Sequence, residues 1–348
     1  MFCLVNYIPE SEKYNLKREI ANTFIKEAEE RESSLVKSSF YSSAIKIYKE
    51  MQSEFTNKKS EIDSKIQELS LKLKSLNKDI EYKSFSTSIT ITNKQVEDYI
   101  SYLKNKDNDL FTAFLDDDKI IPKIDLTKKQ TEEEKKSFPL LFITPKDIVS
   151  KDYTVKKHIS EESIFDYHYR KNILLELKIK EVFLDMVLNE VEKEVDMKSE
   201  IEQLLEISEL KDIRPTLQKG LAFALLKPKD PISAIHLLIP YMEEIIRRII
   251  MKEGIVDSVI EWKKQKTTEQ KTISFRKMEL GGLLINEKVR EIIGNDFSES
   301  IKIYFADEDQ ENIRNLLLHG LVSSEYIKET NSKFVAYCIL KLINILKK

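Results

Sequence analysis

The sequence predicts an all-α protein in which an N-terminal helical region is followed by a C-terminal helical bundle. Of the 348 residues, 34% are charged and 41% are hydrophobic, a composition that suits a soluble and mostly helical chain. Apolar residues recur at helical spacing through several long segments. No proline follows Pro240, so the helices expected in the last part of the chain have no proline to interrupt them.

The first part of the chain, residues 1–115, is expected to form helices and one short helical hairpin. Residues 17–30 and 34–55 have the apolar spacing of helices. A heptad seam then follows, formed by Ile62, Ile66, Leu69, Leu73, Leu76 and Ile80. The seam predicts either a hairpin within one chain or a coiled coil between two chains, and its short length favours the hairpin. A β-branched run leads to Thr92 or Asn93, which we expect to cap the next helix.

Composition divides the rest of the chain into three parts. Residues 116–157 mix three prolines with runs of charge, which indicates a loop-rich connection. Residues 158–229 carry broad apolar stripes, which predict a helical connector. Residues 230–348 form the predicted C-terminal domain, whose first helix is expected to begin after Asp230 and to end at Gly254.

Composition also argues against several classes of function. The net charge of −3 gives no global attraction to nucleic acid, so any such binding needs a local basic patch. The first glycine is Gly220, which argues against a phosphate-binding ATPase loop or a dinucleotide-binding fingerprint. The four histidines and the two distant cysteines, Cys3 and Cys338, offer neither zinc-ligand spacing nor a disulfide framework. We therefore expect no metal and no cofactor.

Neither a signal peptide nor a membrane span is expected. The N-terminus lacks a basic region and reaches Pro9 too early for a signal peptide. No run approaches the ~18 apolar residues that span a bilayer. Residues 334–348 come closest, but Lys341 and their short length indicate a buried amphipathic helix. The sequence therefore predicts a cytoplasmic protein without membrane contact.

Three polar side chains share one face of the helix expected after Asp230. His236, Glu243 and Arg247 are separated by seven and four positions, which places them on the same side of a helix. Glu243 and Arg247 at this spacing favour a surface ion pair worth roughly 0.3 kcal/mol. On spacing alone, the pattern is typical of a solvated helix face rather than of a functional site.

The segment QENIRNLLLHG, residues 310–320, sets Arg314, Asn315 and His319 among leucines. Asn315 and His319 share a helix face, whereas Arg314 and His319 lie about 140° apart around the helix. The three are either polar edges of a packed helix that ends at Gly320, which the residues alone favour, or a catalytic set.

The second interpretation has a chemical basis. Histidine can move a proton from a ribose 2′-hydroxyl or to a leaving oxygen, arginine binds phosphate, and asparagine orients either group. RNA carries its own nucleophile beside the scissile phosphate, so such a set needs no metal. Two copies that face each other across a dimer interface would bring the divergent side chains together in one cleft.

The motif and its surroundings resemble the HEPN superfamily of helical ribonucleases. The segment fits that superfamily's R-x4-H pattern, and NIRNLLLHG is similar to the RNxxxHG signature of a domain of unknown function placed in it. Pro240, Glu243 and Arg247 match the P-x-x-E-x-x-x-R pattern of the first core helix of that branch. ELGGLLINEKVREIIG resembles its middle helix, and the similarity covers roughly residues 215–325.

The resemblance implies a HEPN-like helical bundle that dimerises through the C-terminal domain and cleaves RNA without a metal. Carried over by position, Arg314 binds or polarises the phosphate, His319 is the general acid/base, and Asn315 orients both. Glu243 supports them from the first core helix. The habits of the superfamily further imply a role in antiphage defence or as a toxin. The chain departs from the family pattern before the arginine, where the acidic DEDQEN would repel RNA or cap the helix.

A basic stretch, residues 261–277, combines lysines with a tryptophan and a phenylalanine. This composition suits either RNA binding with base stacking or a solvated loop between helices, and sequence alone favours the loop. We take Lys263, Lys264 and Lys266 from this stretch, together with Arg247, as the candidate substrate-binding residues.

Three functions are consistent with these features. The first is a HEPN-type endoribonuclease that acts on RNA as a homodimer, with N-terminal helices that sense a trigger, restrain the nuclease or bind a regulatory protein. The second is a non-catalytic helical scaffold that dimerises or binds RNA. The third is a toxin that a partner enzyme controls by nucleotide modification.

Overall fold

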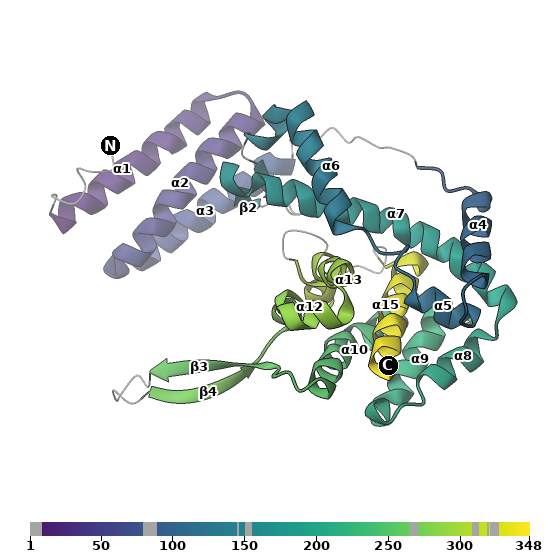
Figure 1. Ribbon diagram of the computed structural model, residues 1–348. Coiled ribbons are helices and arrows are strands. Elements are labelled where there is room, and N and C mark those ends of the chain that lie inside the picture. The colour runs from purple at the N-terminus through teal and green to yellow at the C-terminus, as the bar shows by residue number, and fades with distance from the viewer. Residues whose placement is uncertain are drawn as a thin grey trace. The chain divides into compact units, whose positions relative to one another are not determined.

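The computed structural model describes residues 9–78, 89–144, 146–149, 155–264, 271–307, 313–318, 320 and 327–348. It confirms an all-α fold, to which the described residues add two short antiparallel hairpins (Figure 1). The chain divides into two compact units. The N-terminal unit consists of residues 1–87 and 145–160, and the C-terminal unit consists of residues 88–144 and 161–348.

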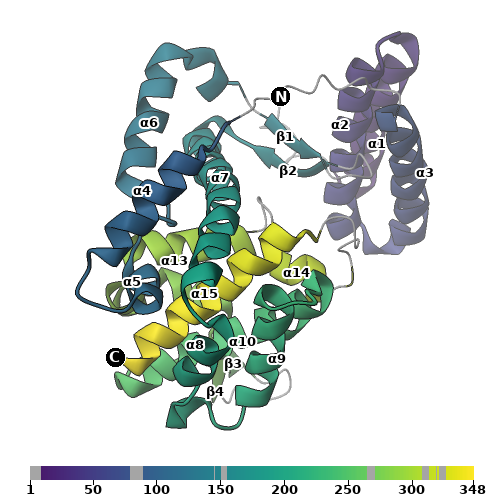
Figure 2. The ribbon, with the colours of Figure 1, turned by 90° about the vertical axis from the view of Figure 1, so that its right-hand side faces the viewer.

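The N-terminal unit is built on three helices that lie side by side in both views (Figures 1 and 2): α1 (Glu10–Glu30), α2 (Ser34–Glu54) and α3 (Lys59–Lys78). Helix α2 packs against the other two, and the 3-10 turn η2 (Thr56–Lys58) joins it to α3. The strands β1 (Lys146–Val149) and β2 (Val155–Ile159) also belong to this unit and pair with each other in antiparallel fashion.

The heptad seam lies on α3 and faces the core of this unit. Its described positions are buried in that core or packed against it: Ile62, Ile66, Leu69, Leu73 and Leu76. Ile80 lies outside the described residues. The prediction of a seam within one chain is therefore confirmed for the described positions, because the residues that cover the seam come from α1 and α2 of the same chain.

The C-terminal unit contains the remaining helices of the described chain. Its α-helices are α4 (Asn93–Lys104), α5 (Leu110–Asp116), α6 (Ile124–Ser137), α7 (Ile164–Glu194), α8 (Met197–Leu204), α9 (Arg214–Leu225), α10 (Pro231–Lys252), α11 (Leu280–Ile285), α12 (Glu287–Ile293), α13 (Asn295–Ile301), α14 (Ile313–Leu318) and α15 (Glu329–Lys347). Its shorter turns are the 3-10 turns η3 (Pro139–Phe142), η4 (Glu161–Ser163) and η5 (Ser208–Leu210), and the π-helical turn η6 (Lys302–Ala306). Its hairpin consists of β3 (Ser258–Lys264) and β4 (Lys271–Lys277).

The last helix, α15, lies at the centre of the C-terminal unit. Every residue from Asn331 to Asn344 is buried, and the helix packs against α5, α7, α9 and α10, among which it runs in Figure 2. A helix buried on all sides needs partners for its polar groups, and Lys333 pairs with Asp185 and Glu329. The predicted burial of this segment is confirmed. No helix in the described part of the chain, α15 included, is long and apolar enough to cross a membrane.

The two units do not follow the boundaries expected from composition. Residues 89–115, which composition groups with the N-terminal helices, include α4 and α5 and bury Tyr99 and Phe114 in the core of the C-terminal unit. Residues 116–157 are not mainly loop, because they contain α6. Residues 158–229 supply α7 to α9, which belong to the same core and do not form a separate connector. The units are set by contacts between distant segments, which prolines and charge runs do not report.

Several helix ends follow the signals read from the sequence. The side chain of Asp230 accepts a hydrogen bond from the backbone N–H of Ser233 at 3.1 Å and so caps α10. Gly254 follows that helix with a φ of 69°, the left-handed conformation expected of a helix-ending glycine. Thr92 caps α4, and its side chain and that of Gln95 form a reciprocal capping box. Both predicted caps are confirmed.

In the basic stretch at residues 261–277, the described residues, 261–264 and 271–277, form strands and not a loop. Strands β3 and β4 pair over seven residues each, with Ser258 opposite Lys277 and Lys264 opposite Lys271. Within the two strands, the segments IEWK and ISFR alternate β-branched or aromatic residues with polar ones, which favours strands. The prediction of a loop was wrong for these residues because it weighed the lysines and not this alternation.

Replacing Thr92 by alanine is expected to lower the free energy of unfolding of the C-terminal unit by about 1 kcal/mol, because one N-terminal N–H of α4 loses its cap. Urea denaturation followed by circular dichroism measures the change. Asn93→Ala is the matched control: Asn93 is exposed and is the first residue of the helix, so it should change stability by less than about 0.5 kcal/mol. Equal effects of the two substitutions would contradict the assignment of Thr92 as the cap.

Candidate functional site

Glu243 is the centre of a polar cluster that joins α10, α11 and α14. Its Oε2 accepts a hydrogen bond from Arg314 Nη2 at 2.8 Å and another from the backbone N–H of Leu280 at 3.1 Å. Its Oε1 accepts a hydrogen bond from Arg247 Nη2 at 2.5 Å. One carboxylate thus binds two guanidinium groups and the first N–H of α11. A carboxylate shared in this way fixes the relative positions of all three elements.

Arg247 is buried, with only 7% of its surface exposed, and its described partners all belong to the protein. Besides Glu243, its Nη1 donates to Asp257 Oδ2 at 3.1 Å, and its Nη2 donates to the carbonyl oxygen of Met278. Burial opposes ionisation of Asp257, but hydrogen bonds from Ser258 and Arg247 hold the pKa of Asp257 below its usual value. The predicted ion pair between Glu243 and Arg247 is confirmed, but the prediction that it lies on a solvated helix face is wrong, because both side chains are largely buried.

Two of the partners of Arg247, Asp257 and Met278, lie at the base of the β3–β4 hairpin. Asp257 immediately precedes β3, Met278 immediately follows β4, and the backbone N–H of Met278 donates to the carbonyl oxygen of Asp257 at 2.8 Å. Arg247 therefore holds the base of the hairpin closed. Its described hydrogen bonds tie Arg247 to the hairpin and to Glu243, and its role in substrate binding stays a prediction.

Arg314 lies at the edge of the core. Helix α14 buries Ile313 and Leu317 against the unit, whereas the Arg314 side chain is 21% exposed and the Glu243 side chain 18% exposed. The ion pair between them therefore lies where solvent and core meet. Gly320 has a φ of 65°, and its N–H donates to the carbonyl oxygen of Leu317 at 3.0 Å, which fits the expected helix end.

The turn that precedes α14 is held by a second polar cluster. The hydroxyl of Tyr304, in the π-helical turn η6, accepts hydrogen bonds from Lys178 Nζ at 3.3 Å and from Asn331 Nδ2 at 3.0 Å. Lys178 and Asn331 also donate to the two carboxylate oxygens of Glu181, at 3.2 and 3.1 Å. Just after the turn, Arg170 Nη1 donates to Asp307 Oδ2 at 3.0 Å. Helix α7 thus anchors the segment that leads to the motif, a function that the sequence did not indicate.

The remaining candidates are placed as follows. His236 is exposed, and its Nδ1 lies 2.8 Å from the carbonyl oxygen of Ile232, so it takes no part in the cluster around Glu243. In the hairpin, Lys263 is opposite Thr272 in the strand register. Asn315 belongs to α14, but nothing is described of its side chain. Lys266 and His319 lie outside the described residues.

The cluster can fix and neutralise a guanidinium group. Two arginines and two carboxylates alternate in it, so their formal charges balance and each ion is hydrogen-bonded within a partly buried site. An arginine held by a carboxylate has its planar fork oriented, which is the preparation that phosphate binding needs.

The structure thus brings together three of the residues singled out in the sequence: Glu243, Arg247 and Arg314. It adds Asp257 and the N–H of Leu280, which no spacing signal in the sequence pointed to, because one lies in a loop and the other is a backbone group. No family model matches the chain, and neither a curated protein nor a solved structure matches it.

Proposed function

We propose that this protein is a metal-independent endoribonuclease of HEPN type that acts in the cytoplasm as an antiphage defence or toxin effector. The observation that supports the proposal most is the ion pair between Arg314 and Glu243. The two residues are 71 positions apart, and the resemblance assigns both to one site, so their contact is what a HEPN-like site requires. The proposed site also includes Asn315 and His319 of the same motif.

The reaction follows from the chemistry of RNA. His319 removes the proton from a ribose 2′-hydroxyl, whose oxygen attacks the adjacent phosphorus, and the bond to the 5′-oxygen of the next nucleotide breaks. That oxygen receives a proton from the protonated His319, which thus serves as both general base and general acid. Arg314, oriented by Glu243, stabilises the charge on the phosphate, and Asn315 orients the reacting groups. The products carry a 2′,3′-cyclic phosphate and a 5′-hydroxyl.

A homodimer completes the proposed site. Residues five apart in a helix point about 140° away from each other, so Arg314 and His319 of one helix do not converge on the same phosphate. Two copies of α14 that meet through the C-terminal unit place the arginine of one subunit beside the histidine of its partner. Lys263, Lys264 and Lys266, in and after strand β3, are proposed to bind the RNA backbone.

RNA cleavage in the presence of EDTA tests the proposal. Purified wild-type protein is expected to cut mixed RNA when EDTA is in excess, whereas His319→Ala is expected to be inactive and folded. The control is His236→Ala, which removes an exposed histidine of α10 outside the cluster and should leave cleavage unchanged. Equal cleavage by His319→Ala would contradict the proposal. In cells, the matching result is growth arrest on expression that disappears with His319→Ala.

A non-catalytic scaffold is the second candidate, and one observation favours it. The cluster around Glu243 is engaged within the protein, where Arg247 closes the hairpin base and Glu243 links three elements. Such a network also serves to make a rigid surface for dimerisation or RNA binding. If the wild-type protein binds RNA in a gel-shift assay but neither it nor any variant cleaves RNA, the result would favour the scaffold. The protein partner that would regulate either function is expected to act through the N-terminal helices.

A further inference from the structure

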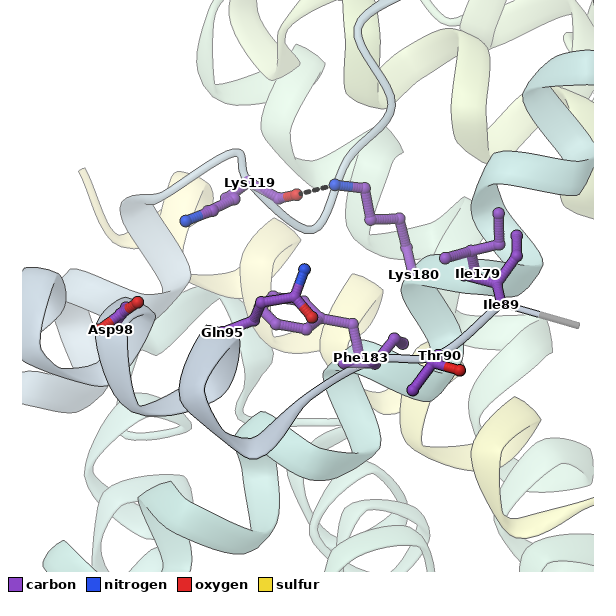
Figure 3. A pocket seen from close by; sticks show the side chains of 9 residues that line it. Ile89, Thr90, Gln95, Asp98, Lys119, Ile179, Lys180 and Phe183 are labelled. Atoms are coloured by element: carbon purple, nitrogen blue, oxygen red, sulfur yellow. Dashed lines mark hydrogen bonds between the residues drawn. The ribbon is translucent and has the colours of Figure 1, made fainter.

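A pocket of about 350 Å³ lies in the C-terminal unit, away from the cluster around Glu243 (Figure 3). It lies beside the start of α4, the loop after α5 and the middle of α7, and its apolar lining is formed by Ile89, Ile91, Ile179 and Phe183. The volume falls in the range of small-molecule sites, about 300–1,000 Å³. The polar groups of the same pocket indicate what kind of molecule it takes.

Lys180 supplies a half-buried positive charge to this pocket. Its Nζ donates to the carbonyl oxygen of Lys119 at 2.7 Å, and no ion pair to a carboxylate accompanies this bond among the described residues. Burial lowers the pKa of Lys180; Glu176 opposes the shift, and the charges of Lys119 and Lys123 add to it. Among the described residues, no carboxylate lies within ion-pair distance of this ammonium group, and Glu176 acts on it only from farther away.

Other buried lysines of the C-terminal unit differ from Lys180 in this respect. Lys333 lies 3.1 Å from Glu329, and Lys341 lies 2.9 Å from Asp118. Charged groups taken out of water are normally paired with an opposite charge. The fold supplies that pairing for these two lysines, whereas the hydrogen-bond partner of Lys180 within the described part of the chain is a neutral carbonyl. An anion in the pocket would provide the missing partner.

Gln95 adds a hydrogen-bond donor of fixed orientation. Its Oε1 accepts from the backbone N–H of Thr92 at 2.8 Å, as part of the cap of α4, so its amide nitrogen faces the other way. In Figure 3 the amide end of Gln95 points toward the gap between the Lys119 and Lys180 side chains. Asp98, the acidic residue of the lining, is exposed, and two lysines outweigh it. Gln95, Lys119 and Lys180 thus bring polar side chains from three separate segments to the lining, and the Nζ of Lys119 also lies 4.8 Å from the centre of the Tyr99 ring.

We propose that this pocket binds a small organic phosphate, whose phosphate lies among Lys180, Lys119 and Gln95 and whose apolar body lies against Phe183 and Ile179. Three donors from three segments suit the tetrahedral oxygens of a phosphate. The apolar lining gives the rest of the ligand a dry contact surface. The site is distinct from the proposed RNA-cleavage site, so it does not depend on that function.

Isothermal titration calorimetry of the whole chain with phenyl phosphate tests this proposal. Inorganic phosphate, which has only the charge, and phenol, which has only the apolar ring, are titrated for comparison. Phenyl phosphate is expected to bind once per chain and at least about tenfold more tightly than either partial ligand, because only it has both the charge and the apolar body. No saturable binding would overturn the proposal. Equal affinity for inorganic phosphate would show an adventitious ion only and would overturn it as well.

Substitutions of Lys180 separate its charge from its packing. Lys180→Met keeps an unbranched side chain without the charge and is expected to weaken phenyl phosphate binding by at least about tenfold, whereas Lys180→Arg should retain binding. Lys171→Met, which changes an exposed lysine of the same helix outside the pocket, is the matched control and should bind as wild type does. If Lys180→Met is folded, as thermal unfolding shows, and binds phenyl phosphate as tightly as the wild type does, the proposed site is contradicted.

A second measurement reads the charge directly. NMR titration of lysine side chains is expected to show that the pKa of Lys180 rises when phenyl phosphate is bound, because the bound anion favours the protonated amine. Inorganic phosphate at the same concentration should produce a smaller rise, in proportion to its weaker binding. An unchanged pKa at saturating phenyl phosphate would place the ligand elsewhere and overturn the proposal.

Discussion

Arg314→Ala is expected to lower the rate of RNA cleavage by about 10²–10³-fold, the loss that usually follows removal of one group that stabilises a developing negative charge. The substitution also removes one of the three donors to Glu243, but the ion pair lies at the edge of the core and is partly exposed, so the cost to stability should be at most about 1 kcal/mol. Single-turnover cleavage of a labelled RNA measures the rate, and urea denaturation measures the stability.

Two further variants distinguish a catalytic arginine from a structural one. Arg314→Lys keeps the charge but not the planar fork, and should recover only part of the rate. Arg248→Ala is the matched control, because Arg248 lies on α10 and pairs with Glu244 and Asp212 away from the cluster. It should reduce stability slightly and leave the rate unchanged. If Arg314→Ala is folded and cleaves like wild type, Arg314 has no catalytic role.

Mixing inactive variants tests whether the site is shared between subunits. If each site combines the arginine of one subunit with the histidine of its partner, a mixed dimer of Arg314→Ala and His319→Ala chains has one intact site. Cleavage is then expected to return on mixing, up to about half the wild-type rate at each mixed dimer. Mixtures of fully exchanged subunits that remain inactive would contradict a shared site.

Lys341→Met is expected to lower the free energy of unfolding by about 3–5 kcal/mol, which is among the largest effects that single substitutions produce. Lys341 is only 5% exposed at the centre of the C-terminal unit. Its Nζ donates to the carbonyl oxygens of Leu115 and Asp117 at 2.8 and 3.2 Å and lies 2.9 Å from Asp118 Oδ1. Methionine fills the same space but takes the Lys341 donor from both carbonyl groups, of which that of Asp117 keeps a hydrogen bond of 3.4 Å from the Tyr337 hydroxyl.

Thermal unfolding, or urea denaturation at a fixed temperature, measures this loss. Lys347→Met is the matched control, because it changes an exposed lysine six positions later on the same helix and should alter stability by less than about 0.5 kcal/mol. A loss below about 1 kcal/mol for Lys341→Met would contradict the account of α15 as a central helix whose polar groups tie the loop after α5 to the core.

Local signals in the sequence predicted local structure well. Asp230 and Gly254 bounded α10, Thr92 capped α4, and the heptad spacing identified the buried face of α3, because each of these depends on residues within one or two helical turns. The all-α fold class follows from the same kind of information.

The contacts that assemble the units were not predictable in this way. Lys341 binds the carbonyl oxygen of Leu115 in α5 across 226 positions, so no local pattern shows that residues 89–115 belong with the C-terminus. Glu243 and Arg247 have the same four-residue spacing whether they are exposed or buried, and their burial depends on Asp257 and Arg314. The hairpin was missed for a different reason, since its alternation was visible but its lysines suggested a solvated segment.

The chemical nature of the RNA ends is the most direct test of the central claim, which is that an arginine and a histidine cleave RNA through its own 2′-hydroxyl. RNA is incubated with wild-type protein in excess EDTA, and the termini of the fragments are identified by mass spectrometry. Fragments with 2′,3′-cyclic phosphate and 5′-hydroxyl ends, absent with His319→Ala, are the predicted result. Fragments with 5′-phosphate and 3′-hydroxyl ends that form only when a divalent metal is added would contradict the account.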